Sequence, residues 1–126
     1  FGDTLVLSDT VGVGTEHEVE VAAGICEKIG IRPALHLHHR ADRELHALSL
    51  VRKGIECGID EFDSSIAGLG GCPFVDGSPG NLATESLVKW LTARGYDCGV
   101  SIDDLANAKR IALKIAEPSL AQTLSV

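Results

Sequence analysis

Residues 34–38 read ALHLH, in which leucine alternates with histidine. An alternation with period two is typical of a β-strand, because successive side chains of a strand point to opposite faces. Residues 41–57 then show apolar side chains at helical spacing, followed by Gly58 as a stop signal. The pattern therefore predicts a strand followed by a helix.

The same order of elements occurs on both sides of this stretch. Upstream, TLVLS at residues 4–8 reads as a strand, and a helix runs from Thr15 to a stop at Gly30. Downstream, residues 60–64 read as a third strand. The strands begin at intervals of 30 and 26 residues with a helix between each, which is the spacing of parallel βα units.

Two further helices are expected in the last third of the chain. The first covers residues 82–94 and ends at Gly95, and the second covers residues 103–116. Asp103 is the expected N-cap of the second helix, and Pro118 is expected to lie beyond its end. The sequence thus predicts one α/β domain over residues 1–126.

Composition excludes several classes of protein. The chain has 126 residues, a net charge of −7 and no block of Lys or Arg, which argues against nucleic acid or an anionic membrane as a partner. No apolar run approaches the roughly 18 residues of a membrane span. Four cysteines stand singly without a CxxC pair, so we expect a reducing compartment.

Polar residues follow the expected strands at their carboxyl ends, where ligands of parallel βα folds bind. Asp9 and Thr10 follow the first strand, and His36 and His38 end the second. The two histidines share one face of a strand, so they could hold one metal ion or could simply be polar residues at a strand end. His39 points to the other face and is expected to be structural.

Two loops near this edge carry further candidates, each with two interpretations. Cys72, between Gly71 and Pro73, is either a proton donor or an inert loop thiol. Asn81 is either the N-cap of a helix or an oxygen ligand to a metal. Glu85 either offsets the helix dipole or supports the ligands around a metal.

A family resemblance rests on four motifs. They are DTVGVGT at residues 9–15, HLH at residues 36–38, FDSSIAGLGGCPF at residues 62–74 and GNLATE at residues 80–85. This set resembles the C-terminal part of hydroxymethylglutaryl-CoA lyases, from about Leu7 to Asp104. The HxH motif also occurs in related aldolases and Claisen synthases, whereas AGLGGCP followed by GNLATE is specific to the lyases.

The resemblance implies a fold and an activity. The fold would be the C-terminal portion of a (β/α)8 TIM barrel with parallel strands, comprising βα units over residues 1–95 and a helical extension over residues 96–126. The activity would be metal-dependent cleavage of 3-hydroxy-3-methylglutaryl-CoA into acetyl-CoA and acetoacetate. A soluble protein of the cytoplasm, or of the mitochondrial matrix in a eukaryote, is expected.

The resemblance also implies roles for single residues. His36, His38 and Asn81 would bind a divalent cation, Mg²⁺ or Mn²⁺. Cys72 would be the catalytic thiol, and His36 would add acid–base help. Asp9, Thr10 and Glu85 would support the ligands or contact the substrate, an acyl-CoA.

The chain also departs from the family pattern. The lyases usually continue from HxH into DTYGQ, whereas this chain has HRADR at residues 39–43. The family's Asp metal ligand and catalytic Arg lie in N-terminal strands that nothing in this chain matches. We therefore expect a fragment that is inactive alone and is completed by the remainder of the barrel or in a homodimer. The alternatives are a related aldolase or Claisen synthase, or a non-catalytic assembly module.

Overall fold

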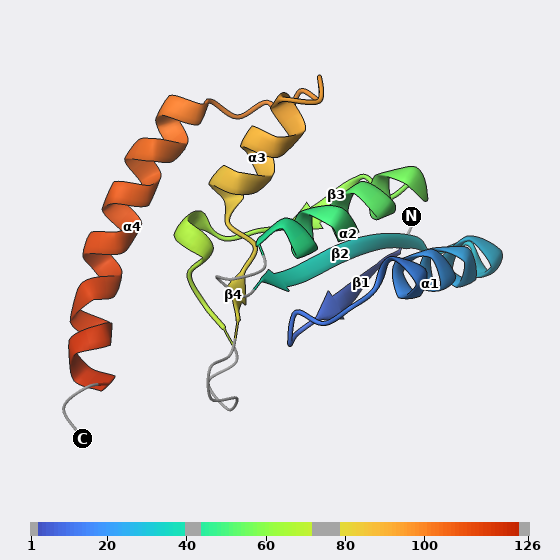
Figure 1. Cartoon of the computed structure of the whole chain (residues 1–126), viewed down its shortest axis with the longest axis horizontal. Helices are drawn as coiled ribbons and strands as arrows, with labels where there is room; N and C mark the ends of the chain where they lie inside the picture. The colour runs from blue at the N-terminus through green and yellow to red at the C-terminus, as the bar shows by residue number, and fades with distance from the viewer. Residues whose placement is uncertain (1–2, 40–43, 72–78, 124–126) are drawn as a thin grey trace.

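The computed structural model describes residues 3–39, 44–71 and 79–123 (Figure 1). Its elements are β1 (Thr4–Asp9), α1 (Glu16–Ile29), β2 (Arg32–His39), α2 (Glu44–Glu56), β3 (Glu61–Asp63), the 3-10 helix η1 (Ile66–Gly68), β4 (Gly80–Asn81), α3 (Thr84–Thr92) and α4 (Ile102–Thr123).

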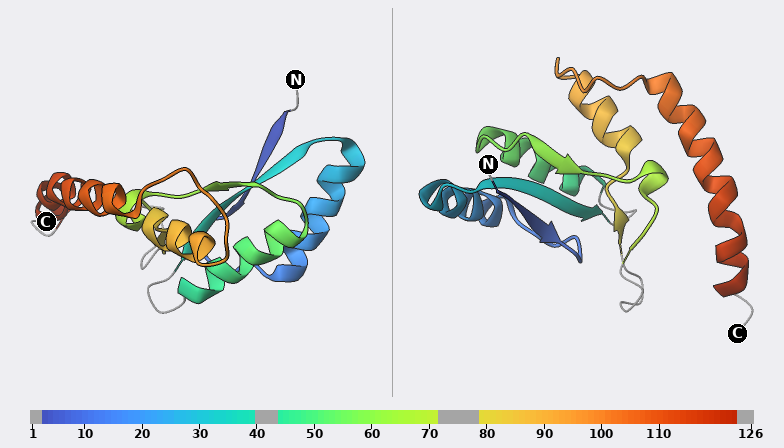
Figure 2. Two further views of the ribbon diagram at one scale, coloured as in Figure 1. Left: turned by 90° about the horizontal axis from the view of Figure 1, so that it is seen from above. Right: turned by 180° about the vertical axis from the view of Figure 1, so that it is seen from behind.

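The three main strands form a parallel sheet in the order β1-β2-β3, as predicted. Helices α1 and α2 lie side by side on one face of this sheet (Figure 2). The short strand β4 pairs antiparallel with the end of β2. Helix α4 packs against η1 and α3, far from α1 (Figure 1).

The core lies between the sheet and helices α1 and α2. Leu35 and Leu37 of β2 are buried in it, so the strand alternation directs His36 and His38 to the opposite face. The other buried members include Val19 and Ala23 of α1, Ala47, Leu48, Leu50 and Val51 of α2, Ile59, Leu82 and Leu87. The helices therefore fix which face of β2 carries the imidazoles.

Helix α1 has the termini that its sequence predicts. The side chain of Thr15 accepts a hydrogen bond from Glu18 N, and the Glu18 carboxylate bonds the Thr15 backbone in return. Hydrogen bonds from the side chain and then the backbone of Thr15 lower the pKa of Glu18. Gly30 ends the helix in the left-handed conformation, with φ of 71°.

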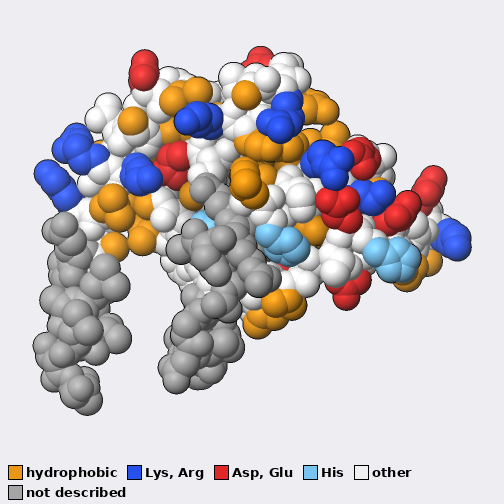
Figure 3. All heavy atoms as spheres, in the orientation of Figure 1, with side chains coloured by type: hydrophobic (Ala, Val, Ile, Leu, Met, Phe, Trp, Pro, Cys, Tyr) orange, Lys and Arg blue, Asp and Glu red, His pale blue; other side chains and the backbone are white. Residues whose placement is uncertain are grey.

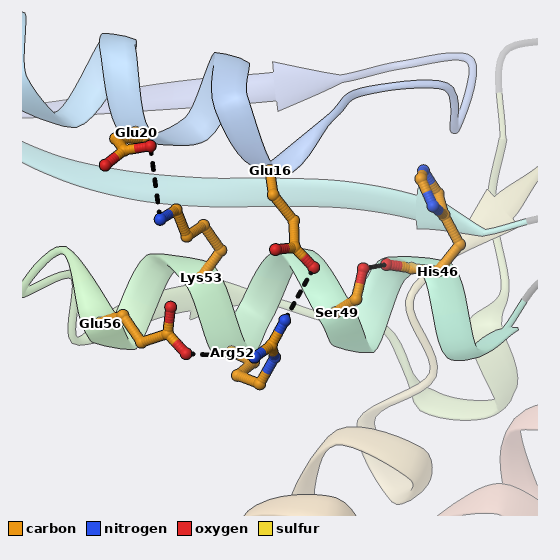
Figure 4. Close-up of polar contacts among 7 residues, drawn as sticks. All are labelled: Glu16, Glu20, His46, Ser49, Arg52, Lys53 and Glu56. Atoms are coloured by element: carbon orange, nitrogen blue, oxygen red, sulfur yellow. Dashed lines mark hydrogen bonds and ion pairs between the residues drawn. The ribbon is translucent and has the colours of Figure 1, made fainter.

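Ion pairs join α1 to α2 on the outer surface (Figure 4). Arg52 contacts Glu16 at 2.9 Å, and Lys53 contacts Glu20 at 3.4 Å. Figure 3 shows Lys and Arg side chains intermixed with Asp and Glu on this part of the surface. Exposed pairs of this kind contribute only about 0–1 kcal/mol each, so the apolar core is the main link between the helices.

The start of α3 corrects one prediction. The helix begins at Thr84, its N-cap is Ala83, and no side chain caps it. Asn81 is not an N-cap, because it lies in β4 opposite His38. The pairing of β4 with β2 is favoured over a cap at Asn81, because it gives hydrogen-bond partners to backbone groups that a cap would leave unpaired.

Both predicted ends of helix α4 also differ from the structure. The hydroxyl of Ser101 accepts a hydrogen bond from Asp104 N at 3.3 Å, so Ser101 occupies the N-cap place that was expected of Asp103. The backbone also stays helical past Pro118 to Thr123. A proline removes one main-chain donor and does not by itself end a helix. Among the described residues, no helix combines the length and apolar character that a bilayer crossing requires.

Two helical glycines give a matched test of this packing. A Cβ on Gly54 of α2 would lie 2.9 Å from Leu35 Cδ1 and 3.2 Å from Phe62 Cε1, whereas one on Gly24 of α1 meets nothing within 4 Å. We expect Gly24→Ala to stabilise the fold by about 0.5–1 kcal/mol. Gly54→Ala should destabilise it, because overpacking a core costs about 1–3 kcal/mol. Urea unfolding measures both, and equal stabilisation would contradict the packing described.

Candidate functional site

Two imidazoles converge at the carboxyl end of β2. The Nε2 atoms of His36 and His38 are 3.0 Å apart, and the ring centroids are 5.0 Å apart with the planes inclined at 66°. His38 is 6% exposed and His36 is half-buried. The strand geometry thus brings two ring nitrogens together in a partly buried position.

The remaining ring nitrogens face acceptor oxygens. His38 Nδ1 lies 3.2 Å from the carbonyl oxygen of Pro79, and a carbonyl only accepts, so Nδ1 carries the proton. His36 Nδ1 lies 3.4 Å from Asp63 Oδ2, an acceptor on the neighbouring strand β3. The two Nε2 atoms are then left to each other, to share one proton or to bind one cation together.

Two ring nitrogens at this separation are compatible with a shared proton or with a cation bound to both. A cation with metal–nitrogen bonds of about 2.1 Å holds two ligands at right angles about 3.0 Å apart, which matches the distance between the two Nε2 atoms. The imidazole pair therefore fits two adjacent positions of an octahedral site.

Asn81 adds an oxygen to this place. It is the register partner of His38 in the antiparallel pair of β4 with β2, and side chains of directly opposed residues lie on one face with Cβ atoms about 5 Å apart. Its Nδ2 donates to Leu69 O at 2.8 Å. Its Oδ1 is buried without a hydrogen-bond partner, which is costly unless a ligand contacts it.

Close backbone packing surrounds Asn81. A Cβ on Gly70 would lie 2.7 Å from Asn81 Nδ2, and one on Gly80 would lie 2.7 Å from the carbonyl oxygen of Gly68. Only glycine fits at both places without moving its neighbours. The glycine-rich segment therefore sets the position of the Asn81 amide. His39, expected to be structural, bonds the Asn81 carbonyl oxygen through Nδ1 at 3.0 Å.

The other candidates that the structure describes lie at the same edge with different partners. Both Glu85 carboxylate oxygens accept from Ala67 N at 3.0 Å. The Asp9 carboxylate closes its own loop by accepting from Val13 N and Gly14 N. Thr10 is exposed in that loop. Cys72 lies outside the described residues.

Sequence reasoning missed one residue of this site. Asp63, which anchors the His36 ring, was read only as part of a strand, and the register that places it opposite His36 is not fixed by the sequence pattern. Outside the site, Ala67 has a positive φ of 57°, which its residue type does not indicate. Within the described ranges, no group of three or more His, Cys, Asp or Glu could hold a metal. The described donors are thus two imidazoles and one amide.

Comparisons with known proteins find that the chain is similar to part of several lyases. No family model matches the chain. The mitochondrial hydroxymethylglutaryl-CoA lyase of Rattus norvegicus is 41% identical over 113 residues, which covers 81% of this chain and 31% of the relative.

Solved structures agree with this similarity. The HMG-CoA lyase of Brucella melitensis superposes with a TM-score of 0.76 at 33% identity, covering 89% of this chain and 39% of that one. An HMG-CoA lyase of Acinetobacter baumannii, in complex with coenzyme A and 3-methylmalate, gives a TM-score of 0.72 at 31% identity, covering 91% and 36%. The chain spans about a third of the length of these relatives, and its parallel βα units are a portion of their (β/α)8 barrel.

Proposed function

Because the chain corresponds in sequence and fold to part of the hydroxymethylglutaryl-CoA lyases, we propose that it forms the metal-holding part of such a lyase. One observation carries this proposal. The Nε2 atoms of His36 and His38 lie 3.0 Å apart, and the buried side-chain oxygen of Asn81, the register partner of His38, has no hydrogen-bond partner. A divalent cation such as Mg²⁺ or Mn²⁺ would satisfy all three atoms at once.

His36, His38 and Asn81 would hold the cation. Asp63 and the Pro79 carbonyl would keep the two rings turned toward it. The described residues contribute no carboxylate ligand to this set, and the further ligand would come from another part of a completed barrel. When bound, the cation would stabilise negative charge on the hydroxyl and carboxylate oxygens of the substrate.

The role of His36 is limited by its own geometry. Its Nε2 has one lone pair, and the same pair cannot bind a metal and accept a proton. Its Nδ1 already faces Asp63. We therefore assign His36 to the metal and not to proton transfer.

The proposed substrate is 3-hydroxy-3-methylglutaryl-CoA. The Acinetobacter relative in complex with coenzyme A and 3-methylmalate supports an acyl-CoA with a hydroxy acid group. Transfer of the C3 hydroxyl proton to a base supplied by the completed barrel, with cleavage of the C2–C3 bond, would release acetoacetate and leave the enolate of acetyl-CoA. We assign to the Cys72 thiol the proton that converts this enolate into acetyl-CoA.

The rest of a barrel is the proposed partner of this chain. Within the described residues β1 pairs with β2 alone. Leu5 and Val6 on this strand are 44% and 47% exposed, and α1 has an exposed apolar stripe of Val21, Ile25 and Ile29. Open parallel edges with apolar sides are a liability that further βα units would cover.

The metal assignment is tested by removing one imidazole. His36→Ala should weaken Mn²⁺ binding by more than roughly tenfold, since even residues that only orient metal ligands contribute 10–100-fold. The unfolding free energy should change by less than about 1 kcal/mol. Titration calorimetry measures the binding, with His17→Ala, at an exposed position of α1, as the matched control. Equal binding by both variants would refute the site.

The proposed activity is tested in a chimera. This chain replaces the matching segment of the Brucella melitensis lyase, which supplies the remaining strands. The chimera should cleave 3-hydroxy-3-methylglutaryl-CoA, and Cys72→Ser should lower its kcat by about 10²-fold or more, as loss of a general acid does. Metal affinity should stay the same. A folded but inactive chimera would refute the proposed function, and normal turnover of the serine variant would refute the thiol's role.

A further inference from the structure

A left-handed residue lies beside the candidate metal site. Ala67, within η1, has φ of 57° and ψ of 13°. In the described ranges, it is the one residue with a positive φ that is not a glycine. Side chains of L-residues clash with their own backbone in this region. Such a conformation persists only where the surroundings impose it, and such places are often functional.

The surroundings of Ala67 include a specific clamp. Glu85, in the first turn of α3, directs both carboxylate oxygens to Ala67 N at 3.0 Å. Bonds from a backbone N–H to a carboxylate are stronger than those to neutral acceptors. A residue that only offset the dipole of α3 would not need this contact with another element. The geometry therefore indicates that Glu85 acts on the turn.

Hydrogen bonds connect the segment after this turn to the candidate metal ligand Asn81. Leu69 follows η1, and its carbonyl oxygen accepts from Asn81 Nδ2 at 2.8 Å. The next carbonyl, that of Gly70, accepts from Asn81 N at 3.3 Å. With its nitrogen held on Leu69, the planar amide must turn its Oδ1 away from that bond.

We propose that Glu85 is a positioning residue for the metal ligand Asn81. By holding Ala67 in the left-handed conformation, Glu85 fixes the carbonyl of Leu69. That carbonyl orients the Asn81 amide, so that Oδ1 is offered on the face shared with His38. The proposal rests on the proposed function in one respect, namely that Asn81 Oδ1 is a metal ligand.

A rescue experiment tests this path. Glu85→Ala should lower the Mn²⁺ affinity of the chain by about tenfold, as loss of a residue that orients a ligand does. Ala67→Gly alone should bind Mn²⁺ like the unchanged chain. In the double variant, glycine adopts the left-handed turn without a clamp, so most of the lost affinity should return. Glu85→Gln keeps one oxygen acceptor. Its Mn²⁺ affinity should therefore lie between that of Glu85→Ala and that of the unchanged chain.

A second readout does not depend on the metal. In ¹⁵N-labelled, metal-free protein, the side-chain amide resonances of Asn81 should move in Glu85→Ala and return toward their original positions in the double variant. Unchanged resonances in a folded Glu85→Ala variant would overturn the proposal. So would a double variant as weak as Glu85→Ala, because the left-handed turn would then not be the link.

The two proposals fail in different ways. If the unchanged chain binds no Mn²⁺, the metal site is refuted, while the amide resonances still decide the role of Glu85. If Glu85→Ala does not fold, the comparison rests on Glu85→Gln with and without Ala67→Gly. Restoration of the Asn81 resonances by Ala67→Gly supports the path, and its absence overturns it.

Discussion

The pairing of β4 with the end of β2 is the interaction on which the site depends. It places Asn81 opposite His38 and Gly80 opposite His39, and Leu82 N extends it by donating to the carbonyl of Leu37 at 2.9 Å. The bond to Leu37 anchors a buried leucine, Leu82, at the start of the segment that leads into α3. The same few hydrogen bonds therefore attach α3 to the sheet and bring an amide beside two imidazoles.

Much of the architecture could be predicted from the sequence, because its periods are clear. The alternation in β2 separates buried leucines from histidines, and the capping box and Gly30 delimit α1. The two-residue strand β4 could not be predicted, since Gly80–Asn81 is too short to show a period. The local signal at Asn81 was that of a helix cap, and the tertiary pairing outweighed it.

The candidate site was predictable to a different extent. The HxH spacing predicts that His36 and His38 share a face, and the structure brings their Nε2 atoms to 3.0 Å. The contacts of the two rings with Asp63 and Pro79 depend on strand register and on a loop, and the sequence pattern indicates neither of them. The left-handed conformation of Ala67 could not be predicted either, because alanine does not favour it and the contact of Ala67 N with Glu85 is tertiary.

We propose that His36, His38 and Asn81 bind one cation together. The decisive experiment adds substoichiometric Mn²⁺ to ¹⁵N-labelled chain at neutral pH and follows the imidazole and side-chain amide resonances. We expect the signals of the three residues to broaden together, while those of exposed His17 stay sharp. Broadening of one histidine alone, or equal broadening of His17, would contradict it.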